Sequence, residues 1–152
     1  MINASSYTPA DDALIPTGEI NSVKNMPFDF TQPKRIGEDR DDPAVQRPAY
    51  GGYDNNFVIN GGNELKFAAM LFDPASGRGF YLYTTEPGLR VYTGNWLDIE
   101  DAKDDVAYTK YSGVALECQH YPDSPNHPEF PSTILRPGET YRQTTIFNFY
   151  TE

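Results

Sequence analysis

The stretch Leu65-Lys66-Phe67-Ala68-Ala69-Met70-Leu71-Phe72 decides the fold class of this chain. Side chains alternate between the two faces of a β-strand, so one face carries Leu65, Phe67, Ala69 and Leu71 and the other face is mixed. Residues 73–77 (Asp-Pro-Ala-Ser-Gly) follow with turn-forming side chains, and residues 79–85 are again rich in Phe, Tyr and Thr. The stretch therefore predicts a β-hairpin.

The same signals continue outward from this hairpin. Further strands are predicted at 14–20, 57–59, 89–93, 113–119 and 141–150, with turn residues between them. Residues 7–12 are typical of a turn, and residues 96–104 could hold one short helical turn. Residues 34–47 are densely charged without an apolar stripe, which indicates an exposed loop or a short helical turn. The pattern predicts an all-β, antiparallel β-sandwich, with a loop-rich entry segment at 1–50 and a strand-rich portion at 51–152.

Charge and cysteine content limit the partners and the compartment. The 152 residues carry a formal net charge of −10, which argues against nucleic acid and against an anionic membrane surface. No apolar run approaches the roughly 20 residues that span a bilayer. The single cysteine, Cys118, can form no disulfide within the chain. We expect a cytoplasmic protein, and the charge says nothing about a neutral substrate.

One acidic residue stands on a predicted strand just before a proline-broken loop. Alternation places Val114, Leu116 and Cys118 on one face of the strand, and Glu117 on the other. A carboxylate among apolar and amide neighbours is either a structural group bonded to nearby backbone or a group tuned for chemistry. The strand alone leaves both interpretations open.

Six short blocks, in order along the chain, carry a resemblance to a known family. The blocks are Pro16-Thr17-Gly18-Glu19, Gly52-Tyr53-Asp54-Asn55-Asn56-Phe57, Thr84-Thr85-Glu86-Pro87-Gly88, Tyr92-Thr93-Gly94-Asn95-Trp96-Leu97, Leu116-Glu117-Cys118-Gln119 with Pro122-Asp123-Ser124-Pro125-Asn126, and Leu135-Arg136-Pro137-Gly138-Glu139-Thr140-Tyr141. Together they resemble the aldose 1-epimerases (galactose mutarotases). The resemblance implies a large twisted β-sandwich, of which this chain is similar to the C-terminal half.

The resemblance also implies roles for three residues. Glu117 matches the general base that takes the O1 proton of an aldose such as galactose or glucose. Asp54 matches an acidic residue that binds sugar hydroxyls, although an Asx-type turn is the simpler interpretation of Asp54 alone. Arg90 stands where many relatives carry a substrate-contacting glutamine; it offers donors but no acceptor, and could instead pair with Asp54 or another carboxylate. The reaction is expected to need neither a metal nor an organic cofactor.

Three aromatic residues near these positions could either contact a sugar or fill the core, namely Phe57, Tyr92 and Trp96. The family's general acid, by the same resemblance, is a histidine in a segment that precedes residue 1. The histidines of the chain, His120 and His127, are poor substitutes for it, and a metal site of Cys118 with both of them is a remote alternative.

Three functions therefore stay open. The first is an epimerase that carries its base but depends on another polypeptide, or on self-association through open sheet edges, for the rest of its site. The second is a non-catalytic carbohydrate-binding β domain or an inactive fragment, and the third is an interaction domain with a degenerate site.

Overall fold

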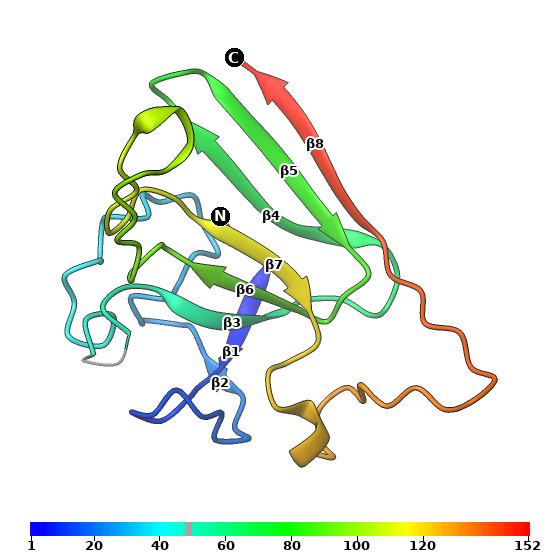
Figure 1. Cartoon of the computed structure of the whole chain (residues 1–152). Coiled ribbons are helices and arrows are strands. Elements are labelled where there is room, and N and C mark those ends of the chain that lie inside the picture. The colour runs from blue at the N-terminus through cyan, green and yellow to red at the C-terminus, as the bar shows by residue number, and fades with distance from the viewer. Residues whose placement is uncertain (48–49) are drawn as a thin grey trace.

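The computed structural model describes residues 1–47 and 50–152. Over these residues the chain forms eight strands and two short 3-10 turns (Figure 1). Their bounds are β1 Ala4–Thr8, β2 Asn21–Ser22, β3 Asp54–Ile59, β4 Lys66–Asp73, β5 Arg78–Thr84, β6 Gly88–Tyr92, η1 Lys103–Asp105, β7 Ala115–Gln119, η2 Ser124–Asn126 and β8 Thr145–Thr151. The strands make two antiparallel sheets, and the predicted all-β class is confirmed.

The smaller sheet has the strand order β4-β5-β8 and contains the predicted hairpin. Met70 pairs with Tyr81 and Phe72 with Gly79 across the hairpin, and a register shift falls between Phe67 and Ala69. Strand β8 then pairs with the other edge of β5 along its whole length, from Thr84–Thr145 to Arg78–Thr151. Figure 1 shows the three strands side by side in the upper part of the molecule.

The larger sheet has the order β2-β1-β3-β6-β7, and its first two strands were missed. The sequence predicted a strand at 14–20, but the chain makes only an isolated bridge between Ala10 and Pro16 there. The Asp11 carboxylate accepts the amides of Ala13 and Ile15, and Leu14 has a φ of 65°. These local bonds hold a tight loop, which competes with an extended strand.

The core lies between the two sheets and also takes side chains from the loop-rich entry segment. Phe57 and Leu89 from the larger sheet and Leu82 from the smaller one are at most 1% exposed. Phe30 packs edge-on against Tyr53 with ring centroids 5.2 Å apart. Val45 is only 1% exposed, so residues 34–47 are not the wholly exposed segment that their charge indicated.

Two parts of the sheets lie open. An apolar cleft of about 610 Å³ runs between the sheets, with a lining that includes Phe30, Ala69, Leu71, Val91, Val114 and Leu116. Strand β8 ends the smaller sheet, and its Phe147 and Phe149 are 45% and 74% exposed. Edge strands and apolar faces of this kind are surfaces on which another chain can pack.

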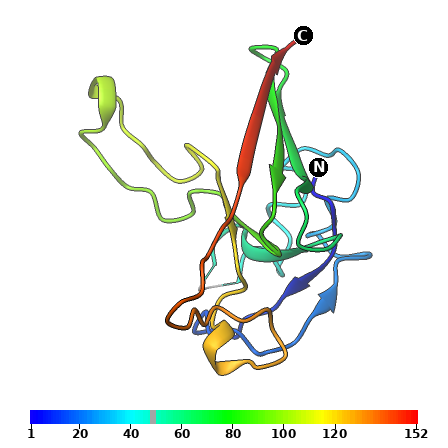
Figure 2. The ribbon, with the colours of Figure 1, turned by 90° about the vertical axis from the view of Figure 1, so that its right-hand side faces the viewer.

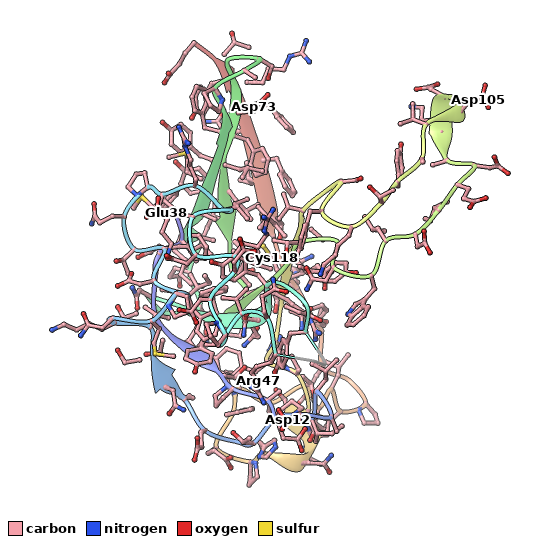
Figure 3. All side chains as sticks on the ribbon, turned by 90° about the vertical axis from the view of Figure 1, so that its left-hand side faces the viewer. Asp12, Glu38, Arg47, Asp73, Asp105 and Cys118 are labelled. Carbon is pink, nitrogen blue, oxygen red and sulfur yellow. The ribbon has the colours of Figure 1, made fainter. Side chains whose placement is uncertain are left out.

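Residues 94–113 form an arm that projects from the body of the molecule (Figure 2). The arm is closed by a bridge between Ile99 and Tyr108, and its outer end carries Asp105 (Figure 3). No helix in the described part of the chain is long and apolar enough to cross a membrane.

Candidate functional site

Strand register brings Asp54, Arg90 and Glu117 to one face of the larger sheet. Arg90 on β6 pairs with Asn56 on β3 at one side and with Glu117 on β7 at the other. Asp54 pairs with Tyr92, two residues along β6, so it lies on the diagonal from Arg90. Since paired side chains across an antiparallel ladder project to the same face, all three predicted site residues face the same side.

Arg90 and Asp54 form an ion pair, which is one of the alternatives that the sequence left open. Arg90 Nε donates to Asp54 Oδ1 at 2.7 Å. The side chain of Asp54 is 10% exposed and that of Arg90 is 32% exposed. The hydrogen bond to Asp54 raises the pKa of Arg90, and the negative charges of Asp54 and Glu117 add to this against the opposing effect of burial. Asp54 is therefore engaged by a cation from the neighbouring strand.

Glu117 is an exposed residue in the middle of β7. Its neighbours Leu116 and Cys118 pack against the hydrophobic core, so the predicted alternation of this strand is confirmed. Figure 3 shows Cys118 near the centre of the molecule. Glu117 consequently bears no burial cost, and its carboxylate lies open to a ligand beside Arg90.

A small cavity of about 30 Å³ adjoins the ion pair and brings in residues that sequence reasoning missed. Its lining includes Thr8, Tyr50 and Asn56 together with Asp54 and Arg90. Asn56 Nδ2 donates to Thr8 Oγ1 at 3.0 Å, while the buried Asn56 Oδ1 has no hydrogen-bond donor among the described residues. A cavity of this size can hold about one water molecule. The signal in the sequence was Asn56 itself, two residues after Asp54 and so on the same strand face.

The three aromatic residues separate into different environments. Phe57 is 1% exposed and belongs to the core. Tyr92 lies on the polar face opposite Asp54, and its Oη accepts the backbone amide of Trp96 at 3.0 Å. Trp96 itself is 61% exposed.

Both histidines are engaged by carboxylates. His120 Nδ1 lies 2.7 Å from Glu86 Oε2, and Glu86 is only 3% exposed. Tyr141 donates its hydroxyl to the other oxygen of Glu86 at 2.5 Å, and this hydrogen bond raises the pKa of Tyr141 to about 12.

His127 Nδ1 is 3.2 Å from Glu129, and its Nε2 is 3.5 Å from Asp123. Within residues 1–47 and 50–152, no group of three or more His, Cys, Asp and Glu side chains is arranged to hold a metal ion.

Comparison with known proteins shows which family this chain resembles in sequence. The family model described as aldose 1-epimerase matches residues 1–148. Galactose mutarotase of Homo sapiens is 43% identical over 149 residues, which cover 97% of this chain and 42% of the human protein. Aldose 1-epimerase of Escherichia coli (strain K12) is 36% identical over 154 residues, covering 99% of this chain and 44% of the bacterial protein.

A solved structure agrees with the sequence comparisons. The crystal structure of a GalM/aldose epimerase homologue from C. elegans superposes with a TM-score of 0.87 at 28% identity, covering 99% of this chain and 44% of the other. The chain thus spans less than half the length of the curated relatives it matches. Family model, relatives and fold agree, and the chain belongs to the aldose 1-epimerase family.

Proposed function

We propose that this chain carries the base-bearing part of a site that interconverts the α and β anomers of hexoses such as galactose or glucose. One observation carries the proposal: Glu117, Arg90 and Asp54 stand on adjacent strands of one sheet face. Family membership gives this arrangement its chemical meaning, since the relatives are named galactose mutarotase and aldose 1-epimerase.

The proposed reaction needs one base and one acid. Glu117 takes the proton from the anomeric O1, the C1–O5 bond breaks as C1=O1 forms, and O5 receives a proton from an acid. Rotation about C1–C2 followed by the reverse steps closes the other anomer. Each positioned proton-transfer group contributes about 10² to 10⁴ in rate.

Asp54 and Arg90 are assigned to the sugar hydroxyls in this proposal. The second oxygen of Asp54 can accept from a hydroxyl, and the terminal amino groups of Arg90 can donate to one. Because Nε of Arg90 is already committed to Asp54, the guanidinium is held in one orientation. Fixed donors and acceptors hold the substrate while C1–C2 rotates. The mechanism needs no metal and no organic cofactor.

The acid is proposed to come from a second polypeptide segment. His120 and His127 are bound to Glu86, Asp123 and Glu129. The apolar cleft of about 610 Å³ and the exposed Phe147 and Phe149 offer a surface that would bury apolar area against such a segment. We therefore propose that residues 1–152 act as one partial domain that docks with the N-terminal portion of the family fold. A second copy of the chain is the alternative occupant of the cleft.

We also propose a cytoplasmic location for the protein. The single cysteine supports it, because disulfide bonds are typical of oxidising compartments.

A second candidate, a non-catalytic carbohydrate-binding domain, is favoured by the engagement of both histidines. It keeps the roles of Asp54, Arg90 and Glu117 as hydroxyl partners but assigns no proton transfer. The two candidates predict different rates of anomer interconversion but the same binding of the sugar.

Polarimetry tests the proposal directly. The decay of optical rotation of freshly dissolved α-D-galactose is followed with the chain, with Glu117→Gln, and with the exposed control Glu64→Gln. Each protein is measured alone and with the N-terminal portion of a relative such as human galactose mutarotase. Acceleration that requires the added portion, is lost in Glu117→Gln and is kept in Glu64→Gln supports the enzyme and the docking together.

Other results select other conclusions. Acceleration by the chain alone would overturn the need for a second polypeptide. Sugar binding without any acceleration, in protein shown by circular dichroism to be folded and by sedimentation to have bound the added portion, would select the binding domain.

A further inference from the structure

We propose that Trp96 is an apolar platform against which the sugar ring packs, at the Asp54 end of the polar sheet face. This inference rests on the proposed function and extends it to a residue with no proton-transfer role. Its starting observation is that Trp96, the only tryptophan of the chain, is 61% exposed while its neighbour Asn95 is 2% exposed.

Buried hydrogen bonds fasten residues 93–95 to the residue that precedes Asp54. Asn95 Nδ2 donates to the carbonyl of Tyr53 at 2.9 Å. Thr93 Oγ1 donates to Asn95 Oδ1 at 2.6 Å and accepts the amide of Tyr53 at 3.1 Å. Buried hydrogen bonds of this kind are expensive to break, so the backbone that leads into Trp96 is held in place.

Trp96 itself has two further neighbours, one at its backbone and one at its ring. Its backbone amide donates to Tyr92 Oη at 3.0 Å, and Tyr92 pairs with Asp54 across the β3–β6 ladder. The ring lies against Gly51, where a Cβ would be 3.8 Å from both Cζ2 and Cη2 of the indole. Tyr92 pairs with Asp54 on the polar face and accepts the Trp96 amide, so Trp96 lies toward the Asp54 end of that face.

The other exposed apolar residues of the arm show what distinguishes Trp96. Ile99, Val106 and Tyr108 are 47%, 54% and 38% exposed, and they lie at or beyond the bridge that closes the arm. The arm carries these three away from the body of the molecule (Figures 2 and 3). Trp96 lies at the base of the arm, where its amide bonds to Tyr92 of the sheet and its ring lies near Gly51 of the preceding loop.

A pyranose ring suits such a platform because its faces carry C–H groups while its hydroxyls point outward. The C–H groups at C3, C4 and C5 of galactose lie together on one face, since its 4-hydroxyl is axial. In glucose the corresponding hydrogens alternate between the faces. An indole plane can cover the apolar face while Asp54, Arg90 and Glu117 bind hydroxyl groups. Trp96 would then favour galactose over glucose in binding.

The single tryptophan makes the test direct. Indole emission of the intact chain is titrated with D-galactose and with D-glucose, and saturation-transfer NMR measures the binding of each sugar independently. The variants are Trp96→Phe, Trp96→Ala and Asp54→Ala, and Tyr108→Ala is the matched control on the same arm. A stacking interaction of the usual strength predicts that Trp96→Ala weakens galactose binding by about 3- to 10-fold. Trp96→Phe should lose less, and Tyr108→Ala should bind as the unchanged chain does.

The outcomes separate this inference from the proposed function. A saturable change in emission, with a galactose preference that falls in Trp96→Ala, supports the platform. Galactose binding that Asp54→Ala abolishes but Trp96→Ala leaves unchanged overturns the platform and leaves the proposed function standing. If neither sugar binds the chain by either method, the platform is overturned, while acceleration of mutarotation with the added N-terminal portion would still support the proposed function.

Discussion

Arg90 stands directly across the β6–β7 ladder from Glu117, while its Nε is bound to Asp54 at 2.7 Å. The carboxylates of Asp54 and Glu117 therefore come from the two strands that flank Arg90. Arg90 is thus bonded to Asp54 on one side and lies within the electrostatic influence of Glu117 on the other. Structural and functional roles of this residue can be separated by measuring unfolding and activity on the same variants.

Arg90→Leu should destabilise the fold, because it leaves the largely buried carboxylate of Asp54 without its cation. Losing a hydrogen bond to a charged group typically lowers the free energy of unfolding by about 1.5 to 3 kcal/mol. Urea unfolding followed by circular dichroism measures this loss. The matched control is Arg78→Leu, because Arg78 is an exposed arginine on a strand of the smaller sheet. Equal losses for the two variants would show that the Asp54 pair adds nothing to stability.

Tyr141→Phe should change the dependence of stability on pH only in alkaline solution. The pKa of Tyr141 is raised from 10.0 to about 12 by its hydrogen bond to Glu86. The folded state therefore holds this proton more tightly than the unfolded state, so the stabilisation is complete below pH 10.0 and is lost as pH rises toward about 12.

The measurement is urea unfolding of both proteins across this pH range. The unchanged chain should lose stability relative to Tyr141→Phe, and the difference ultraviolet titration of the two proteins should show one tyrosine ionising near 12. Parallel stability curves would contradict the Glu86 hydrogen bond.

Sequence patterns predicted the strands that alternate strongly and missed those set by distant contacts. The hairpin of β4 and β5 was found because Leu65 to Phe72 alternate and a turn follows. Strand β1 was missed because its extended form depends on pairing with β3, more than 45 residues away, from Thr8–Asn56 to Ala4–Ile59. Local propensity carries no information about such a partner.

The sequence named the residues of the proposed site but not their geometry. Asp54, Arg90 and Glu117 were named from the resemblance, and their common face follows from register, which sequence alone does not fix. Asn56 and Thr8 were missed because their contact joins β3 to the unexpected strand β1. Trp96 was named with Phe57 as either core or sugar contact, and the structure separates them, since Phe57 is 1% exposed and Trp96 is 61% exposed.

Phe149→Lys should reduce self-association of the isolated chain. Phe149 is 74% exposed on the terminal strand of the smaller sheet, where it joins Phe80 and Phe147 in an apolar cluster. A charge on an edge strand opposes pairing with another copy. Sedimentation velocity over a range of concentrations should show a lower weight-average mass for Phe149→Lys. Asn148→Lys is the matched control, because Asn148 is exposed on the same strand and alternation turns it to the opposite face. An equal effect of both changes would show that added charge alone, and not the apolar face, governs association.

Gly52→Ala should disrupt the buried hydrogen bonds of Asn95, the residue before Trp96, and Gly62→Ala should not. Gly52 has a φ of +154°, and a Cβ there would overlap Oδ1 of Asn95 and lie 2.9 Å from Cε1 of Tyr111. A Cβ on Gly62 meets no atom within 4 Å. Strain and displacement together should cost Gly52→Ala more than about 1 kcal/mol of unfolding free energy, while Gly62→Ala should stay within about 0.5 kcal/mol of the unchanged chain. Indole emission adds a local readout, because Asn95 precedes the only tryptophan. If Gly52→Ala kept both its stability and its emission spectrum, Asn95 would not be the group that holds Trp96 in place.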